Sequence, residues 1–211
     1  SVALVDSEVV RTHGLVVDDS ESRQDIALNQ LVHQNIDQKF TKKVISSMDN
    51  HEEQWKAENG IQRCGALMGV GKDVLGDAFV MSENAVGVVL GQVGKSIEAD
   101  MAQHDPQWKA ESGISKHNSL ETRLKDRMGK SIPVEATQIV LKQITPSIRE
   151  DMNQHDIQWQ AESGINKYAY LAEQLKGFRF QVSGLKVLPD DATMIEAEIK
   201  NLIDQQHVDL I

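Results

Sequence analysis

The chain has 211 residues, of which 40% are hydrophobic and 26% are charged, and its formal net charge is −10. This acidic balance, without a cluster of Lys and Arg, argues against nonspecific binding to nucleic acid or to an anionic membrane surface, because both need a basic patch. Cys64 is the only cysteine, which excludes an intramolecular disulfide and a cysteine-rich zinc site and favours a reducing, cytoplasmic location.

Residues 1–22 are predicted to form a β-prone N-terminal arm. Two short runs rich in valine, at 2–5 and 14–17, favour extended backbone. The first ten residues, SVALVDSEVV, carry acids rather than a basic stretch followed by an apolar run, so they do not resemble a signal peptide. A leader that had already been removed would leave no trace in this sequence.

A twelve-residue segment occurs three times along the chain. It reads NHEEQWKAENGI at 50–61, QHDPQWKAESGI at 103–114 and QHDIQWQAESGI at 154–165. Its histidines are 53 and 51 residues apart, and a period near 50 is typical of arrays of helical hairpins. We therefore predict a mostly α fold with three tandem helical-hairpin repeats of about 52 residues each. The predicted repeats span 23–76, 82–129 and 131–177.

Each repeat is predicted to contain a long helix, a glycine joint and a shorter helix. Apolar residues before the segment recur at helical spacing and form one stripe. Its expected core residues include Met48, Met101 and Met152. The expected ends of the long helices are Gly60, Gly113 and Gly164, because glycine tolerates the left-handed conformation after a helix. The other expected caps are Gly76 and Gly129 at C-termini and Ser82 and Ser131 at N-termini, with Pro133 in the first turn of the third repeat.

The repeated segment has a structural interpretation as a joint between hairpins. In it, Trp fills the space where hairpins meet, His satisfies a buried partner, and Glu accepts from amides at the start of the next helix. Along an uninterrupted helix each histidine would lie inside the apolar stripe. The candidate joint residues are His51, Trp55, Glu58, His104, Trp108, Glu111, His155, Trp159 and Glu162.

A second interpretation is a metal or small-ligand site formed by His51, His104 and His155. Asp100 and Asp151 precede two of these histidines by four residues, which places two potential ligands one turn apart. However, the first copy has Ser47 at that position, and stacked hairpins place equivalent residues in a ladder rather than at one point. The structural joint is therefore the preferred interpretation.

The most apolar stretch is NAVGVVLGQVG at 84–94, which is shorter than the roughly 20 residues that a membrane-spanning helix needs. Its small-residue spacing, beginning at Gly87, predicts close packing of a central helix. Insertion into a membrane after a conformational change is a third functional hypothesis.

Residues 178–211 are predicted to form a β-hairpin followed by a helix. FRFQVSGLKVLP at 178–189 alternates apolar and polar residues around a Ser-Gly turn, and an amphipathic helix follows from Pro189. Because an isolated hairpin is marginally stable in water, we expect it to pair with the N-terminal arm in a small β element. The whole chain is expected to fold as one cooperative domain.

The preferred function is a non-enzymatic protein–protein interaction or structural assembly module. No residues match a recognisable catalytic motif, so we predict neither enzymatic activity nor a cofactor. The repeated, acidic framework favours a protein partner or self-association, without nucleic acid and without a stable membrane span. Ligand or metal binding through His51, His104 and His155 is the alternative.

Overall fold

The computed structural model describes residues 19–77, 79–176, 193, 196–197 and 200. These residues are mostly helical and include no strand, which confirms the predicted mostly α fold. The predicted terminal β element lies outside the described residues, apart from 19–22, which are helical. The described residues of the predicted C-terminal helix, Thr193, Glu196, Ala197 and Lys200, are helical. The chain divides into two compact units, residues 1–171 and 172–211, and the packing described below concerns the first.

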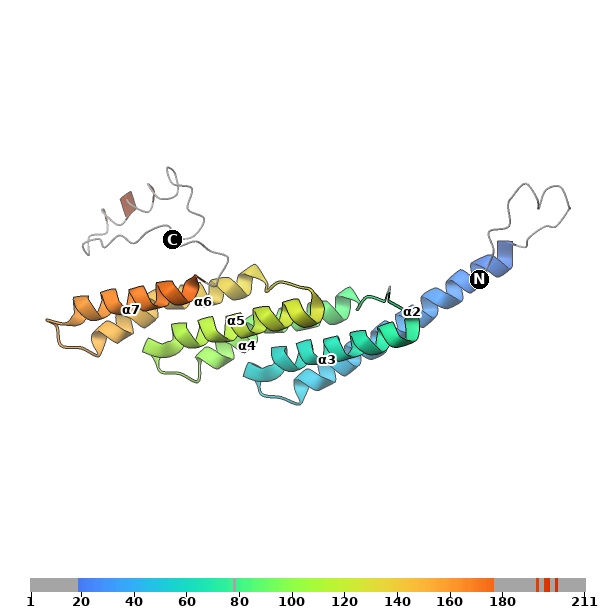
Figure 1. Cartoon of the computed structure of the whole chain (residues 1–211), viewed down its shortest axis with the longest axis horizontal. Coiled ribbons are helices and arrows are strands. Elements are labelled where there is room, and N and C mark those ends of the chain that lie inside the picture. The colour runs from blue at the N-terminus through green and yellow to red at the C-terminus, as the bar shows by residue number, and fades with distance from the viewer. Residues whose placement is uncertain (1–18, 78, 177–192, 194–195, 198–199, 201–211) are drawn as a thin grey trace. The chain divides into compact units, whose positions relative to one another are not determined.

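The described residues contain six α-helices in three consecutive antiparallel pairs (Figure 1). The first pair is α2 (Asp19–Asp49) and α3 (Glu53–Leu75). The second is α4 (Glu83–Met101) and α5 (Lys109–Met128), with the short 3-10 helix η1 (Pro106–Trp108) between them. The third is α6 (Val134–Asn153) and α7 (Gln160–Leu175). The connection inside each pair is only a few residues long, so the second helix returns antiparallel to the first.

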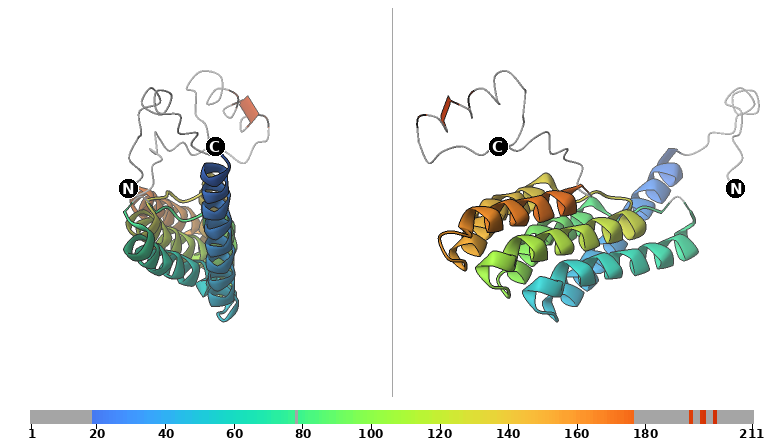
Figure 2. Two further views of the ribbon diagram at one scale, coloured as in Figure 1. Left: turned by 90° about the vertical axis from the view of Figure 1, so that its right-hand side faces the viewer. Right: turned by 60° about the vertical axis from the view of Figure 1, so that its left-hand side comes forward.

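The pairs lie side by side, and each packs on the next (Figure 2). α3 contacts α2 and both helices of the second pair, while α5 contacts α3, α4 and α6. The hydrophobic core therefore runs through the boundaries between pairs as well as inside them. Its fully buried members include Val44, Ile61, Val89, Val93, Ile97, Ile114, Leu120, Leu124, Val140 and Leu171.

α4 illustrates how the sequence selects the buried face of a helix. Val89, Val93, Ile97 and Met101 recur every four residues and are all buried. A Cβ added at Gly87 would meet no atom within 4 Å, so the predicted close packing at this glycine is wrong. Gly87 lies on the exposed side of the helix. None of the helices in the described part of the chain is long and apolar enough to cross a membrane.

The turn inside each pair precedes the predicted glycine joint, so that prediction is wrong. α2 ends at Asp49 and α4 at Met101, whereas Gly60, Gly113 and Gly164 lie within the second helices. Glu52 and Asp105 have extended backbone, which is the conformation of a residue just before a helix. In the second copy, Pro106 then opens the next helical segment, where its fixed φ and missing N–H cost little.

The repeated glycines serve packing rather than turning. A Cβ at Gly60, Gly113 or Gly164 would lie 2.8, 2.6 or 2.7 Å from the sulfur of Met48, Met101 or Met152, respectively. Met48 and Met101 are 4% and 6% exposed, which confirms their predicted place in the core. Each glycine therefore lets the second helix of a pair lie directly against a methionine of the first.

The other predicted caps have mixed outcomes. Gly76 and Gly129 end α3 and α5 with φ angles of 93° and 62°, as predicted, and glycine adopts these angles without strain. Ser82 caps α4 by accepting a hydrogen bond of 3.3 Å from a first-turn amide. Ser131 does not cap α6, because the extended Pro133 occupies the N-cap position and delays the start of the helix.

Candidate functional site

A buried lysine joins the first helix pair to the second. Lys116 of α5 is 5% exposed, and its Nζ lies 4.0 Å from the centre of the Trp55 ring at the start of α3. The same amine donates to Oε1 of Glu58 at 2.8 Å and lies 3.9 Å from Oδ1 of Asp100. The negative face of the indole and the two carboxylates together replace the hydration that this cation loses on burial.

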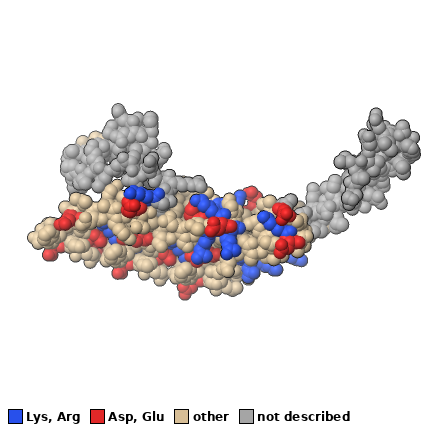
Figure 3. All heavy atoms as spheres, viewed as in Figure 1, with Lys and Arg blue, Asp and Glu red and all other residues tan. Residues whose placement is uncertain are grey.

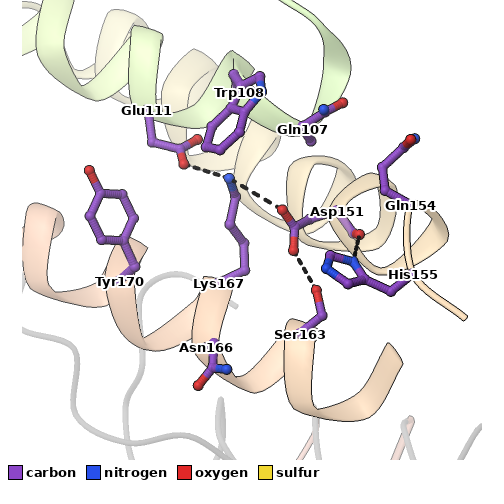
Figure 4. Close-up of a pocket in the computed structure, with 10 residues that line it drawn as sticks. All are labelled: Gln107, Trp108, Glu111, Asp151, Gln154, His155, Ser163, Asn166, Lys167 and Tyr170. Carbon is purple, nitrogen blue, oxygen red and sulfur yellow. Dashed lines mark hydrogen bonds and ion pairs between the residues drawn. The ribbon is translucent and has the colours of Figure 1, made fainter. Parts of the chain in front are cut away.

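The second and third pairs repeat this contact (Figure 4). Nζ of Lys167 lies 4.0 Å from the centre of the Trp108 ring, donates to Oε1 of Glu111 at 2.5 Å, and lies 3.8 Å from Oδ1 of Asp151. Trp108 and Glu111 come from the second pair, whereas Lys167 and Asp151 come from the third. We call these two sets, Trp55–Glu58–Lys116 and Trp108–Glu111–Lys167, the lysine joints.

Beside each lysine joint, a serine orients the aspartate that faces the lysine. Oγ of Ser112 donates to Oδ2 of Asp100 at 2.5 Å, and Oγ of Ser163 donates to Oδ2 of Asp151 at 2.5 Å. One carboxylate oxygen is thereby bound to the serine while the other faces the lysine. Because a buried charge is costly unless it is paired and hydrogen-bonded, the serine helps to make the burial of the lysine tolerable.

Two further serines connect adjacent pairs through the backbone. Oγ of Ser96 in α4 accepts from the amide of Ala57 at 3.2 Å and donates to the carbonyl of Glu53 at 2.7 Å. Ser147 in α6 makes the same two bonds to the preceding pair, at 3.1 and 2.9 Å. Each hydroxyl thus bridges a carbonyl and the amide four residues later, which are the two groups that a continuous α-helix joins directly, and we call these contacts the serine clips.

The hydrogen bonds around Glu53 add a link beside the first serine clip. The hydrogen bond from Lys56 lowers the pKa of the Glu53 carboxyl most, and the hydrogen bond from Gln92 lowers it further. The bond to Glu53 also raises the pKa of Lys56. Gln92 belongs to α4, so its bond to Glu53 crosses from one pair to the next.

The repeated histidines lie in the turns, and their predicted place in the apolar stripe is wrong. The first helix of each pair ends before its histidine, so the rotation of an uninterrupted helix no longer applies there. His51, His104 and His155 are exposed. Nδ1 of His51 lies 2.8 Å from the Ser47 carbonyl, and Nδ1 of His155 lies 2.9 Å from the Asp151 carbonyl. Among the described residues no group of three His, Cys, Asp or Glu side chains is placed to hold a metal ion.

The predicted roles of the repeated Trp and Glu also change. Glu58 and Glu111 bind a lysine of the next pair instead of helix amides. Trp55 and Trp108 are 43% and 50% exposed, so each indole covers a lysine rather than filling a closed space as a wedge. In the third copy, Trp159 is 54% exposed and Glu162 is exposed as well.

Sequence analysis missed the lysines and serines that complete these contacts. The signal was present, because Lys116 and Lys167 are 51 residues apart, as are Ser96 and Ser147. This equals the separation of the second and third repeated histidines. Extending the alignment beyond the twelve-residue segment would have revealed these shared positions, although not the partners they bind.

A hollow of about 520 Å³ opens beside the second lysine joint (Figure 4). Its charged lining groups, Glu111, Asp151 and Lys167, already pair with one another. The other side chains that line it are polar or aromatic, namely Gln107, Trp108, Gln154, His155, Ser163, Asn166 and Tyr170.

Two further buried titratable groups, Cys64 and His117, occupy one repeat position. Cys64 is fully buried, and this burial raises the pKa of its thiol to about 11. His117, which stands 53 residues later, is 4% exposed, and burial lowers its pKa. Its Nε2 lies 2.9 Å from Oγ1 of Thr137. A buried, protonated thiol is a poor nucleophile, so Cys64 fits the core and not a reactive site.

Comparisons with protein-family models, with curated proteins and with solved structures each find no match to this chain. Function is therefore inferred from the chain's own residues and their contacts.

Proposed function

We propose that this chain is a non-enzymatic helical-repeat protein that acts as a structural assembly module. In this proposal the three helix pairs are copies of one unit, and each unit carries the two halves of a lysine joint on opposite faces. The observation that supports it most is that Trp55 and Glu58, and again Trp108 and Glu111, bind a lysine of the next pair. The repeated residues thus connect units instead of converging on one point, as in other repeat arrays.

The same contacts support a non-enzymatic role without a cofactor. A catalytic amine must reach its substrate, but Lys116 and Lys167 are each 5% exposed and paired with carboxylates. The carboxylates are in turn occupied by the lysines and by serine hydroxyls. We therefore assign these side chains to binding between units.

A protein is the partner that best fits these surfaces. A face that receives one helix pair presents apolar and charged groups at helical spacing, which another helical unit can match. Nucleic acid is a poorer partner, because the basic groups on the described part of the face in Figure 3 lie among acidic ones. The lone cysteine supports a cytoplasmic location for this assembly.

The test is the absolute mass in solution, measured by light scattering on a sizing column over a concentration series. An assembly module should show a mass above the 23.5 kDa of one chain that rises with concentration. A mass of one chain at every concentration would contradict self-assembly. Stoichiometric zinc or iron in natively purified protein would instead support the ligand-binding alternative through His51, His104 and His155.

A further inference from the structure

The third helix pair carries half of a lysine joint that no lysine or arginine of the described residues completes. Ile61 and Ile114 are 1% and 2% exposed, whereas Ile165 at the same repeat position is 55% exposed. Glu162 forms no ion pair within the described part of the chain, in contrast to Glu58 and Glu111. We call this surface the tail face. Its residues are Ile157, Trp159, Ala161, Glu162 and Ile165.

The first helix pair carries the opposite half. Arg63 stands at the repeat position of Lys116 and Lys167, but it is exposed and forms no ion pair with any described residue. Ser47 replaces the aspartate of the later copies, so the pair supplies no carboxylate of its own at that position. A hollow of about 470 Å³ adjoins Arg63. Its lining is basic and polar, with Lys42, Lys43, Ser46, Ser47, Asn50 and His51.

Exposed valines extend the same surface of the first pair. Val70 and Val74 are 53% and 75% exposed. They stand 53 residues before Arg123 and Arg127, which in the second pair lie against α3: a guanidinium nitrogen of Arg123 is 3.9 Å from Glu58, and Arg127 packs beside Gly65. Positions that receive the preceding pair inside the chain are thus apolar and open in the first pair. We call the surface formed by Lys43, Ser47, Arg63, Val70 and Val74 the head face.

We propose that the tail face of one copy docks on the head face of a second copy, so that Arg63 takes the place of the missing lysine. This contact deepens the assembly function proposed above and rests on it. A guanidinium can stack on the Trp159 indole and pair with the Glu162 carboxylate at once, as Lys116 does with Trp55 and Glu58. The acidic, apolar tail and the basic, apolar head are complementary in charge and in hydrophobic content.

The contact between copies differs from the lysine joints in one respect. Lys43 stands where Ser96 and Ser147 form the serine clips. Its ammonium can donate to a backbone carbonyl but cannot accept from the amide of residue 161. The contact between copies is therefore weaker than the packing within the chain, and association is reversible and depends on concentration. Because a tail face binds a head face, two docked copies still have one free tail face and one free head face between them. Further copies can therefore add to form a growing chain, or the two free faces can close a ring.

Charge exchange tests this contact in the full chain. Glu162→Arg and Arg63→Glu are each prepared, and sedimentation velocity measures the mean mass of each variant and of their equimolar mixture over a concentration series. Each variant alone places like charges at the contact and should weaken association roughly tenfold or more. In the mixture, the tail face of either variant meets a head face of opposite charge on the other variant. The mixture should therefore regain association that neither variant has alone. Glu98→Arg, an exposed change on the side of α4 opposite Ser96, is the matched control and should associate as the unmodified chain does.

The other outcomes separate this contact from the function on which it rests. If the unmodified chain associates and both variants associate equally well, the head-to-tail contact is wrong while the assembly function stands. If the unmodified chain stays a monomer throughout, self-assembly and this contact are both wrong. Because both substituted residues are exposed, the variants should unfold at the same temperature as the unmodified chain. Thermal melting followed by circular dichroism checks this, so that a loss of mass can be distinguished from unfolding.

Discussion

Ile114 and Ile165 stand at the same position of the repeated segment, yet one is 2% and the other 55% exposed. The twelve-residue segments around them differ at only a few positions. Ile114 lies in α5, which packs against α6 of the third pair, whereas Ile165 of the third pair is open to solvent. The repeated segment is therefore one half of a contact, and its burial depends on whether a neighbouring helix pair packs against it.

The cations at the equivalent repeat position of the three helix pairs also differ in burial. Lys116 and Lys167 are buried between an indole and two carboxylates, while Arg63 at the same position is exposed. A lysine that is desolvated inside the chain needs partners in place, whereas an exposed arginine retains its hydration until a partner arrives.

The comparison of isoleucines predicts the largest effect. Ile114→Ala removes a buried side chain and should lower the free energy of unfolding by about 2–5 kcal/mol. Ile165→Ala should cost less than about 1 kcal/mol in dilute protein, because much of this side chain is already in contact with water. Urea denaturation at low concentration measures both, and equal costs would show that the third copy is covered in the same way as the second.

Removal of a joint lysine should produce the next largest effect. Lys167→Met leaves Glu111 and Asp151 facing each other without the cation, and should destabilise the fold by about 2 kcal/mol, less than for a fully buried pair because both carboxylates are partly exposed. Lys167→Arg should retain most of the stability, since a guanidinium keeps the charge and stacks on the indole. Lys176→Met is the control, because its side chain is 70% exposed and its loss should change stability little.

Gly113 and Gly91 allow a glycine in a close contact between helices to be compared with a glycine that faces no neighbouring atom. A Cβ at Gly113 would lie 2.6 Å from the Met101 sulfur, so Gly113→Ala should cost about 1–2 kcal/mol through overpacking. Gly91→Ala meets no atom within 4 Å and should stabilise α4 by up to about 1 kcal/mol through helix propensity. Thermal and urea unfolding of the two variants measure the contrast. A stabilised Gly113→Ala protein would mean that the methionine moves aside freely.

The buried imidazole of the second pair predicts the smallest effect, and it depends on pH. Burial lowers the pKa of His117, so below about pH 6.5 the unfolded chain binds a proton that the folded chain does not. Stability should therefore fall as the pH decreases through that value, by up to about 1 kcal/mol between pH 7 and pH 5. His117→Gln should flatten this dependence in urea denaturation, and His104→Gln, a change in an exposed turn, should leave it in place. An unchanged slope in His117→Gln would assign the dependence to other groups.

Local sequence was a sound guide to the helical class and to several helix ends. The apolar spacing identified Met48 and Met101 as core residues, and Gly76 and Gly129 end their helices as predicted. The predicted helix end at Gly60 was wrong, because a glycine in the sequence can indicate either a helix end or a close contact between helices. Only the position of Met48 in the folded structure distinguishes the two. The predicted β element stays a prediction, because 1–18 and 178–189 lie outside the described residues.

The sequence by itself determined that the chain is mostly helical and that one segment recurs three times, because both follow from residue types at regular spacing. Only the tertiary structure decided that Lys116 and Lys167 bind the tryptophan and glutamate of the preceding pair. Judged from its neighbours in sequence, a lysine on a helix belongs to the solvated face. It becomes a buried joint only when a helix more than 50 residues away in the chain excludes water from it and supplies the opposite charge.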